Sequence, residues 1–224
     1  MSIAENLIEI RKSIPQNVKL IAVSKTQPVE IIQEAYDEGQ RVFGENKPQE
    51  LRDKYELMQK DIEWHMIGHL QTNKVKYIAP FVSLIHSVDS LKLMGEINKE
   101  AIKNNRIIDC LIQIDIAHEQ TKFGLLEDEA KQILKSQHYI QMKNIRFCGV
   151  MGIGSITDDI NKTRNEFTNL KSTFLRLKEE FFSKDNCFCE ISMGMSSDFS
   201  IAIDQGSTMV RIGSSIFGER NYLK

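Results

Sequence analysis

Short runs rich in β-forming residues recur eight times along this chain, and each is followed by a segment with the spacing of a helix. Parallel strands need crossover connections long enough to hold a helix, so this alternation predicts βα units around a parallel sheet. The runs are VKLIAVS from Val18, RVFGEN from Arg41, IEWHMIG from Ile62, FVSLIHSV from Phe81, DCLIQIDI from Asp109, IRFCGVMGIG from Ile145, CFCEISMG from Cys187 and TMVRIGS from Thr208.

The segments between these runs carry helix signals. Pro28 and Pro48 suit first-turn positions, and Gly39 suits the stop after a helix. Apolar residues keep the three-four spacing of a helix lying on a sheet over 160–181. They are Ile160, Phe167, Leu170, Phe174, Leu177 and Phe181.

Eight βα units in 224 residues without a linker predict one domain, residues 1–224. They could close into a barrel or form an open doubly wound sheet. An open dinucleotide-binding sheet would need G-x-G-x-x-G after the first strand. Residues 24–28 read SKTQP there instead. The count of eight βα units and the missing G-x-G-x-x-G motif favour a single (β/α)8 TIM-type barrel.

Charge and apolar patterning exclude several function classes. The formal net charge is -2 with both signs interspersed, which gives no basic field for nucleic acid. The N-terminus lacks a secretory pattern, and no apolar run is long enough to cross a membrane, so we expect a cytosolic protein. No zinc-type spacing links the cysteines, and we expect all four to be reduced core thiols. They are Cys110, Cys148, Cys187 and Cys189.

In a barrel of this kind the chemistry lies at the carboxyl ends of the strands, which here are polar. The residues at these ends are Ser24 and Lys25, Glu45 and Asn46, Gly68 and His69, His86 and Ser87, Asp115, Met151 and Gly152, Ser192 through Ser197, and Arg211 through Ser215. His65, His69 and His86 fit no metal triad and are predicted to pack or hydrogen-bond within the barrel, beside a core Trp64.

The loops after the last two strands read SMGMSSD and RIGSS. Glycine lets the backbone approach an anion, and serine hydroxyls and helix N-termini add favourable dipoles. Either loop alone would be read as a simple turn. Two such loops at the same end of a barrel favour a phosphate site.

Lys25 and Arg211 complete the pattern of a particular cofactor. A lysine amine attacks an aldehyde only when it is unprotonated, a state that burial or a nearby cation favours. Lys25 at the barrel mouth, with Arg211 across it, meets both conditions. A captured aldehyde, a held phosphate and a contacted ring nitrogen together describe pyridoxal 5′-phosphate (PLP).

The chain resembles the pyridoxal phosphate homeostasis protein family, also described as proline synthetase co-transcribed homologues. The matching stretches span nearly the whole chain in the correct order. They are AVSKTQP, FGENKPQEL, WHMIGHLQTNK, HSVD, GVMGIG, ISMGMSSD and VRIGSSIFGER. The family is similar to the N-terminal barrel of bacterial alanine racemase, which implies a (β/α)8 barrel that carries PLP. The resemblance to the family also favours a monomer.

The resemblance also implies roles for single residues. It makes Lys25 the residue that holds PLP as an internal aldimine, and it places Arg211 against the pyridine nitrogen. Asn46 would lie near the ring. The phosphate would be held by Ser196, Gly213 and Ser214.

Three further positions are compared with the family. Lys122 matches a lysine that family members carry near the PLP site, and it would either take part in cofactor relay or be a solvated loop residue. Lys224 is a weaker candidate for such a relay. Gln27 departs from the family, whose bacterial members commonly have lysine there.

Two features favour binding over catalysis. A guanidinium donates and keeps its proton, so a pyridine nitrogen facing Arg211 stays unprotonated and withdraws electrons poorly. Racemases that resemble this barrel use a further domain with an acid/base group, whereas this chain ends soon after the last strand. Its tyrosines are not expected to replace that group: four fall away from the strand ends and one lies in the tail. They are Tyr36, Tyr55, Tyr77, Tyr139 and Tyr222.

The sequence therefore predicts a non-enzymatic PLP protein that serves intracellular PLP homeostasis and passes the cofactor to apo PLP enzymes. The alternative is a minimal PLP-dependent amino-acid racemase or lyase. A cofactor-free aldolase using Lys25 directly is disfavoured by the phosphate loops together with Arg211.

Overall fold

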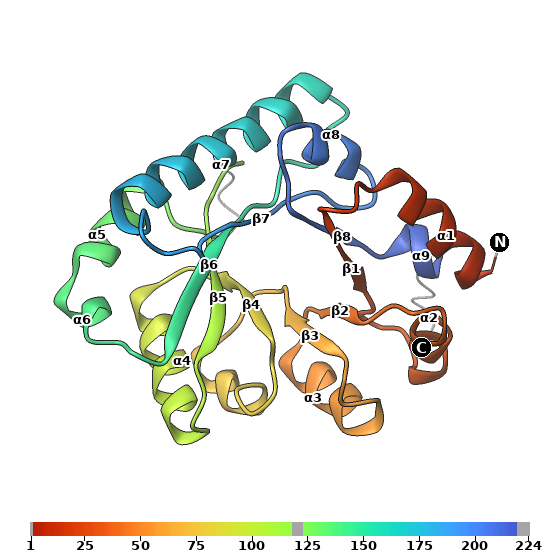
Figure 1. The fold of residues 1–224 in the computed structure, drawn as a ribbon, viewed down its shortest axis with the longest axis horizontal. Coiled ribbons are helices and arrows are strands. Elements are labelled where there is room, and N and C mark those ends of the chain that lie inside the picture. The colour runs from red at the N-terminus through yellow and green to blue at the C-terminus, as the bar shows by residue number, and fades with distance from the viewer. Residues whose placement is uncertain (1, 118–122, 219–224) are drawn as a thin grey trace.

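A computed structural model of the chain describes residues 2–117 and 123–218, and its eight parallel strands form a closed barrel (Figure 1). The last strand pairs with the first, with Ile21 opposite Arg211, so the blue and red ends of the chain lie side by side. This confirms the predicted (β/α)8 barrel. The strands are β1 Lys19–Val23, β2 Val42–Glu45, β3 Glu63–Met66, β4 Leu84–Val88, β5 Ile108–Gln113, β6 Ile145–Met151, β7 Glu190–Ser192 and β8 Met209–Ile212.

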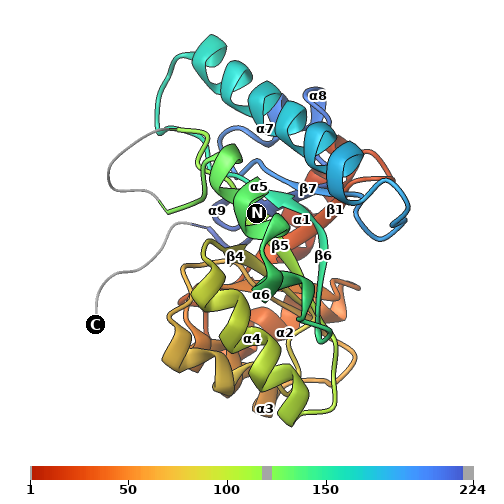
Figure 2. The ribbon, with the colours of Figure 1, turned by 90° about the vertical axis from the view of Figure 1, so that its left-hand side faces the viewer.

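Helices surround the strands, and the longest of them, α7, runs along one side of the barrel (Figure 2). The connection between β3 and β4 is a 3₁₀-helix, η1, instead of an α-helix. The helices are α1 Ile3–Ser13, α2 Val29–Asp37, α3 Pro48–Leu57, η1 Thr72–Tyr77, α4 Leu91–Lys103, α5 Glu127–Lys135, α6 Gln137–Ile140, α7 Ile160–Phe181, α8 Phe199–Asp204 and α9 Ser214–Phe217.

Most of the helix signals in the sequence are confirmed. Pro48 is the first residue of α3, and Gly39 follows α2 with φ +83°, a conformation that glycine adopts without strain. The bounds of α7 are the predicted 160–181, although Ile160, in its first turn, is 58% exposed and does not join the buried face. The first-turn placement of Pro28 is wrong. It precedes the first turn of α2 as an extended N-cap, with ψ 160°.

The strands are shorter than the apolar runs, and this overturns one prediction. Cys187 and Cys189 are exposed, because β7 begins only at Glu190 and the residues before it turn on the surface. Cys110 and Cys148 are buried as expected. Across residues 2–117 and 123–218 no group of three histidine, cysteine or acidic side chains could hold a metal ion.

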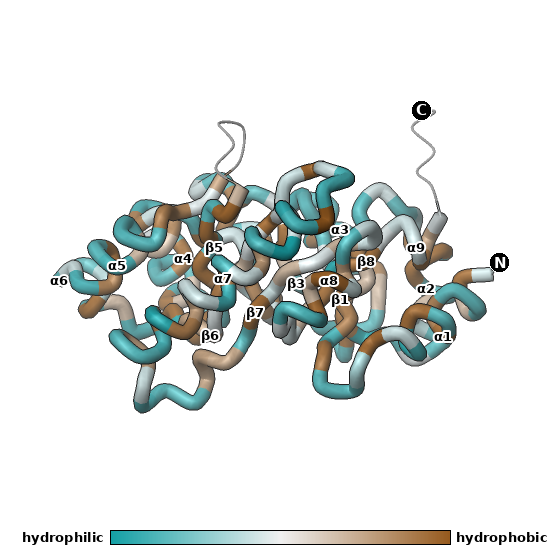
Figure 3. Tube along the Cα trace, turned by 90° about the horizontal axis from the view of Figure 1, so that it is seen from above, coloured by the Kyte–Doolittle hydropathy of each residue, from teal (hydrophilic) through white to brown (hydrophobic). Residues whose placement is uncertain are grey.

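Apolar side chains form two separate layers of core. The larger lies between strands and helices and includes Trp64, which is 1% exposed, as predicted. The smaller fills the barrel interior and consists of Ile21, Leu84, Leu111, Cys148, Met151 and Met209. The strands are brown over much of their length in Figure 3, whereas the helices alternate with teal. No helix in the described part of the chain is long and apolar enough to cross a membrane.

Candidate functional site

A cavity of about 340 Å³ opens at the carboxyl ends of the strands, a size typical of small-ligand pockets. All six residues that the sequence singled out line it together. The lining consists of Val23, Lys25, Asn46, Ile67, Ile153, Met195, Ser196, Ser197, Arg211, Gly213 and Ser214. We call it the mouth pocket.

Strand alternation explains why Lys25 enters the mouth pocket. Side chains two residues apart on a strand point to the same face. Ile21 belongs to the interior core and Val23 lines the mouth pocket, so Lys25 continues this inward row just beyond the end of β1. The Lys25 side chain is half-buried there.

Arg211 lies deeper, at 5% exposure, and reaches the barrel interior from β8. Its Nη1 donates to Ser192 Oγ over 2.7 Å, and its Nη2 donates to the backbone carbonyl of Gly152 over 3.0 Å. Burial lowers the pKa of Arg211 to about 10, so the guanidinium remains charged at neutral pH. These two bonds fix the plane of the charged group at the pocket wall.

Behind Arg211 a hydrogen-bonded chain crosses the barrel interior. Ser192 Oγ lies 3.0 Å from His86 Nδ1, and His86 Nε2 lies 3.0 Å from His65 Nδ1. Burial lowers the pKa of His65 to about 3 and that of His86 well below its usual range, so both rings are neutral. The prediction that these histidines hydrogen-bond within the barrel is confirmed.

Ser192 was expected at a strand end, but its contacts with Arg211 and His86 were not predicted from the sequence. The local signal for the histidines was alternation: His65 lies between Trp64 and Met66 of the outer core, and His86 follows Ile85 of the same core. The third histidine behaves differently. His69 is partly exposed, stacks on Phe123 at 3.8 Å between ring centroids, and places Nδ1 3.3 Å from Asp89.

The two glycine- and serine-containing loops meet at the rim of the mouth pocket. The backbone N–H of Gly213 donates to Ser196 Oγ over 3.2 Å, which joins the loop after β8 to the loop after β7. A Cβ atom on Gly213 would lie 3.1 Å from the carbonyl oxygen of Val23, so glycine keeps the rim close to β1. The helices that follow these loops, α8 and α9, have only six and four residues. An anion at this rim would therefore be bound mainly by backbone N–H groups and hydroxyls, and the dipoles of such short helices would add little.

A second cavity, of about 290 Å³, adjoins the mouth pocket and shares Asn46, Ile67 and Ile153 with it. It carries two ionisable groups, His69 and Asp115, which follow β3 and β5 and were expected at this end of the barrel without an assigned role. Its remaining lining residues are Gly68, His69, Gln113, Ile114, Asp115 and Phe123.

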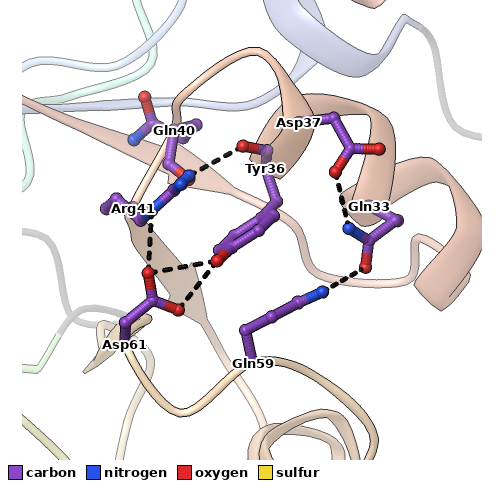
Figure 4. Close-up of polar contacts among 7 residues, drawn as sticks. All are labelled: Gln33, Tyr36, Asp37, Gln40, Arg41, Gln59 and Asp61. Carbon is purple, nitrogen blue, oxygen red and sulfur yellow. Dashed lines mark hydrogen bonds and ion pairs between the residues drawn. The ribbon is translucent and has the colours of Figure 1, made fainter.

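The described tyrosines lie on outer helices, and none of them lines either cavity. Tyr36, near the end of α2, shows how such a residue is used (Figure 4). Its hydroxyl lies 2.9 and 3.1 Å from the carboxylate oxygens of Asp61, and the guanidinium of Arg41 stacks 3.8 Å from its ring centroid. This cluster precedes β2 and β3, at the end of the barrel away from the mouth pocket. Lys122, Lys224 and Tyr222 lie outside the described residues.

The chain is similar in sequence to known proteins over nearly its whole length. Residues 1–221 match the family described as alanine racemase, N-terminal domain. A pyridoxal phosphate homeostasis protein of Aquifex aeolicus is 42% identical over 205 residues, covering 91% of this chain and 88% of that protein. The protein of the same name from Homo sapiens is 40% identical over 220 residues, covering 92% and 78%.

Solved structures of other proteins share the fold. PipY of Synechococcus elongatus PCC7942, solved with PLP bound, is 32% identical and superposes with a TM-score of 0.88, and the match covers 97% of this chain and 100% of PipY. An alanine racemase from Bartonella henselae has a TM-score of 0.70 at 14% identity, over 97% of this chain and 60% of the racemase. Because the identity to the racemase is so low, this similarity shows a shared fold and nothing about function.

Proposed function

This chain belongs to the alanine racemase N-terminal domain family and, within it, to the pyridoxal phosphate homeostasis proteins, and on that premise we propose that it binds PLP at Lys25. The observation that carries the proposal is that Lys25, Arg211 and the two glycine- and serine-containing loops line one cavity. They come from the beginning and the end of the chain.

The donor set suits PLP. A phosphate accepts hydrogen bonds, and Ser196 and Ser214 offer hydroxyls at one rim, where the N–H of Gly213 donates to Ser196 Oγ and leaves that hydroxyl proton available. Apolar side chains of Val23, Ile67 and Ile153 provide walls against which an aromatic ring can lie. The cavity of about 340 Å³ has room for a single substituted ring with its phosphate.

Each polar residue then has a distinct task. PLP supplies an aldehyde with which an amine condenses reversibly, with loss of one water. Lys25 supplies that amine. Arg211, held by Ser192 and Gly152, would donate to the ring nitrogen and keep its own proton, because a guanidinium does not give one up. Asn46 would fix the ring edge.

We propose further that the protein holds PLP for intracellular homeostasis and delivers it to apo-enzymes instead of catalysing a reaction. Support comes from the names of its relatives, which describe homeostasis and no reaction. A pairing of the ring nitrogen with Arg211 would also leave the ring a weak electron sink, which disfavours carbanion chemistry. A monomeric state and a cytosolic location stay predictions.

The adjoining cavity favours one alternative, a minimal PLP-dependent racemase or lyase. His69 and Asp115 line that cavity, which has room for a small amino acid beside Lys25. Incubation with amino acids in deuterated water separates the two functions. Rapid deuterium incorporation at the α-carbon would identify an enzyme, whereas a carrier should give almost none.

The binding proposal is tested by borohydride reduction of the PLP-loaded protein followed by peptide mass mapping. A phosphopyridoxyl group on Lys25 is expected, and Lys25→Ala protein should lose the visible absorption band. An unchanged band in Lys25→Ala protein would contradict the proposal. Delivery is tested by mixing loaded protein with an apo PLP enzyme, whose activity should return faster than free dissociation of PLP allows.

A further inference from the structure

The residues on both sides of Lys25 are held by one cluster of charged side chains. Glu45, at the end of β2, and Glu50 and Lys54, on α3, make up this cluster, which we call the Lys54 cluster. On the N-terminal side of Lys25, Ser24 Oγ donates to Glu45 Oε1 over 2.6 Å. The backbone carbonyl of Ser24 accepts a second hydrogen bond from Lys54 Nζ at 2.8 Å.

On the other side of Lys25 the cluster supports a strained residue. Thr26 has φ +66°, in the left-handed region that β-branched residues rarely adopt and that costs about 1–3 kcal/mol. Its backbone N–H donates to Glu50 Oε1 over 2.6 Å. A carboxylate acceptor makes this a charge-assisted hydrogen bond, of a kind stronger than one between neutral groups. Glu50 thus stabilises the unusual turn that follows Lys25.

Lys54 joins the two sides. Its side chain is 7% exposed, and it donates to Ser24 O, Glu45 Oε1 and Glu50 Oε1 at 2.8, 2.8 and 2.7 Å. An ammonium has three N–H donors and no acceptor, so these partners use all of them. Lys54 therefore holds the backbone before Lys25 and the two carboxylates of the cluster in one fixed arrangement.

The cluster acts from outside the mouth pocket. Ser24 and Glu45 alternate with the inward row and face α3, and no member of the cluster lines the mouth pocket. Whatever the cluster does for bound PLP must therefore pass through the backbone of residues 24–26.

We propose that the Lys54 cluster is a positioning device that fixes the backbone on both sides of Lys25 and keeps its amine directed into the mouth pocket. The inference rests on the proposed function, because it takes Lys25 to be the residue that bonds PLP. Without the cluster the amine is within reach for only part of the time, and the apparent affinity for PLP falls in proportion to that fraction.

The experiment compares two ligands in Glu50→Ala protein. PLP has the aldehyde that Lys25 captures, whereas pyridoxine 5′-phosphate has the same ring and phosphate with an alcohol in its place. Loss of the Glu50 contacts should weaken PLP binding about tenfold, or about 1.4 kcal/mol, and leave pyridoxine 5′-phosphate unchanged. Glu56→Ala, at an exposed position on the same helix, is the matched control and should change neither affinity.

The possible outcomes are distinct. An equal loss of affinity for both ligands would mean that Glu50 only supports the fold of the mouth pocket. Unchanged affinity for both ligands would mean that Lys25 needs no such support. Either result overturns the inference. The double variant Glu45→Gln, Lys54→Met removes two opposite charges together. It should show the same selective loss and replaces Glu50→Ala if circular dichroism finds that protein unfolded.

Lys25→Ala separates this inference from the proposed function. If Lys25→Ala protein keeps the parent affinity for PLP, the proposed function fails. If it loses affinity while Glu50→Ala protein does not, only the positioning role fails. Borohydride reduction followed by intact mass gives an independent readout, since the fraction of protein carrying the cofactor should fall in Glu50→Ala protein.

Discussion

Arg211 Nη1 donates to Ser192 Oγ over 2.7 Å, and this contact joins the charged wall of the mouth pocket to the hydrogen-bonded chain in the barrel interior. A guanidinium only donates, so the Ser192 hydroxyl proton is free to point at His86 Nδ1. In that arrangement neutral His86 carries its proton on Nε2 and donates to His65 Nδ1. Ser192 thus links the cation at the mouth pocket to both histidines in the barrel interior.

Replacement of Ser192 by alanine should interrupt this hydrogen-bonded chain and destabilise the fold. The substitution leaves Arg211 without one acceptor and His86 Nδ1 without its hydrogen-bond partner, at a cost of about 1–3 kcal/mol in the free energy of unfolding. Urea titration measures the loss. Ser183→Ala, at an exposed serine after α7, should stay within about 0.5 kcal/mol of the parent. Equal stability of the two variants would show that the chain contributes nothing.

His65 should make the fold sensitive to acid. Its folded-state pKa of about 3 lies below the ordinary 6.5, so the unfolded chain binds more protons below pH 6.5. The stability associated with neutral His65 is complete above that pH and falls by about 2 kcal/mol between pH 7 and pH 5. Unfolding of parent and His65→Gln proteins at several pH values checks this. The variant should lose correspondingly less over the same interval.

Glu45 should act in the opposite direction. Burial raises its pKa to about 7; Lys54 opposes this rise, while Glu50, on the same helix, adds to it. Ser24 binds Oε1, and Oε2 has no hydrogen-bond partner, so a proton on Oε2 breaks no existing bond. The folded state holds the proton above the ordinary pKa of 4.5, so stability falls as pH rises from 5 to 8.

The size of the Glu45 effect is about 2 kcal/mol over that interval. Glu45→Gln protein lacks the titrating group, so the difference in unfolding free energy between parent and variant should change by this amount. A difference that does not vary with pH would contradict the raised pKa.

Gly68 controls the position of Asn46. A Cβ atom at Gly68 would lie 2.5 Å from the carbonyl oxygen of Asn46 and 2.7 Å from its Cα, so the backbone of Asn46 must move in Gly68→Ala protein. We expect a loss of PLP affinity of about tenfold, or about 1.4 kcal/mol, measured by titration of the visible absorption.

A second glycine provides the control for Gly68. Gly95 lies within α4, and its added Cβ would meet only Met142 Cε at 3.7 Å. Gly95→Ala should therefore leave PLP affinity unchanged and stabilise the helix by about 0.5–1 kcal/mol. Equal affinity of the two variants would place Asn46 outside the binding surface.

The sequence by itself determined the barrel and the residues at its mouth. Apolar periodicity is a property of short sequence segments. The eight strands and the limits of α7 could therefore be predicted without knowledge of any long-range contact. Because parallel strands align their carboxyl ends, Lys25, Asn46 and Arg211 were expected at one rim, and they line one cavity.

Only the tertiary structure decided which partners these residues have. Closure of the barrel joins His86 to Ser192, 106 positions away in the chain, and packing of α3 brings Lys54 to Ser24, 30 positions away. No local pattern encodes such pairs, because a buried polar group is satisfied by whichever donor or acceptor the fold places within about 3 Å of it. The same applies to the exposure of Cys187, which depends on where β7 begins and not on the apolar run around it.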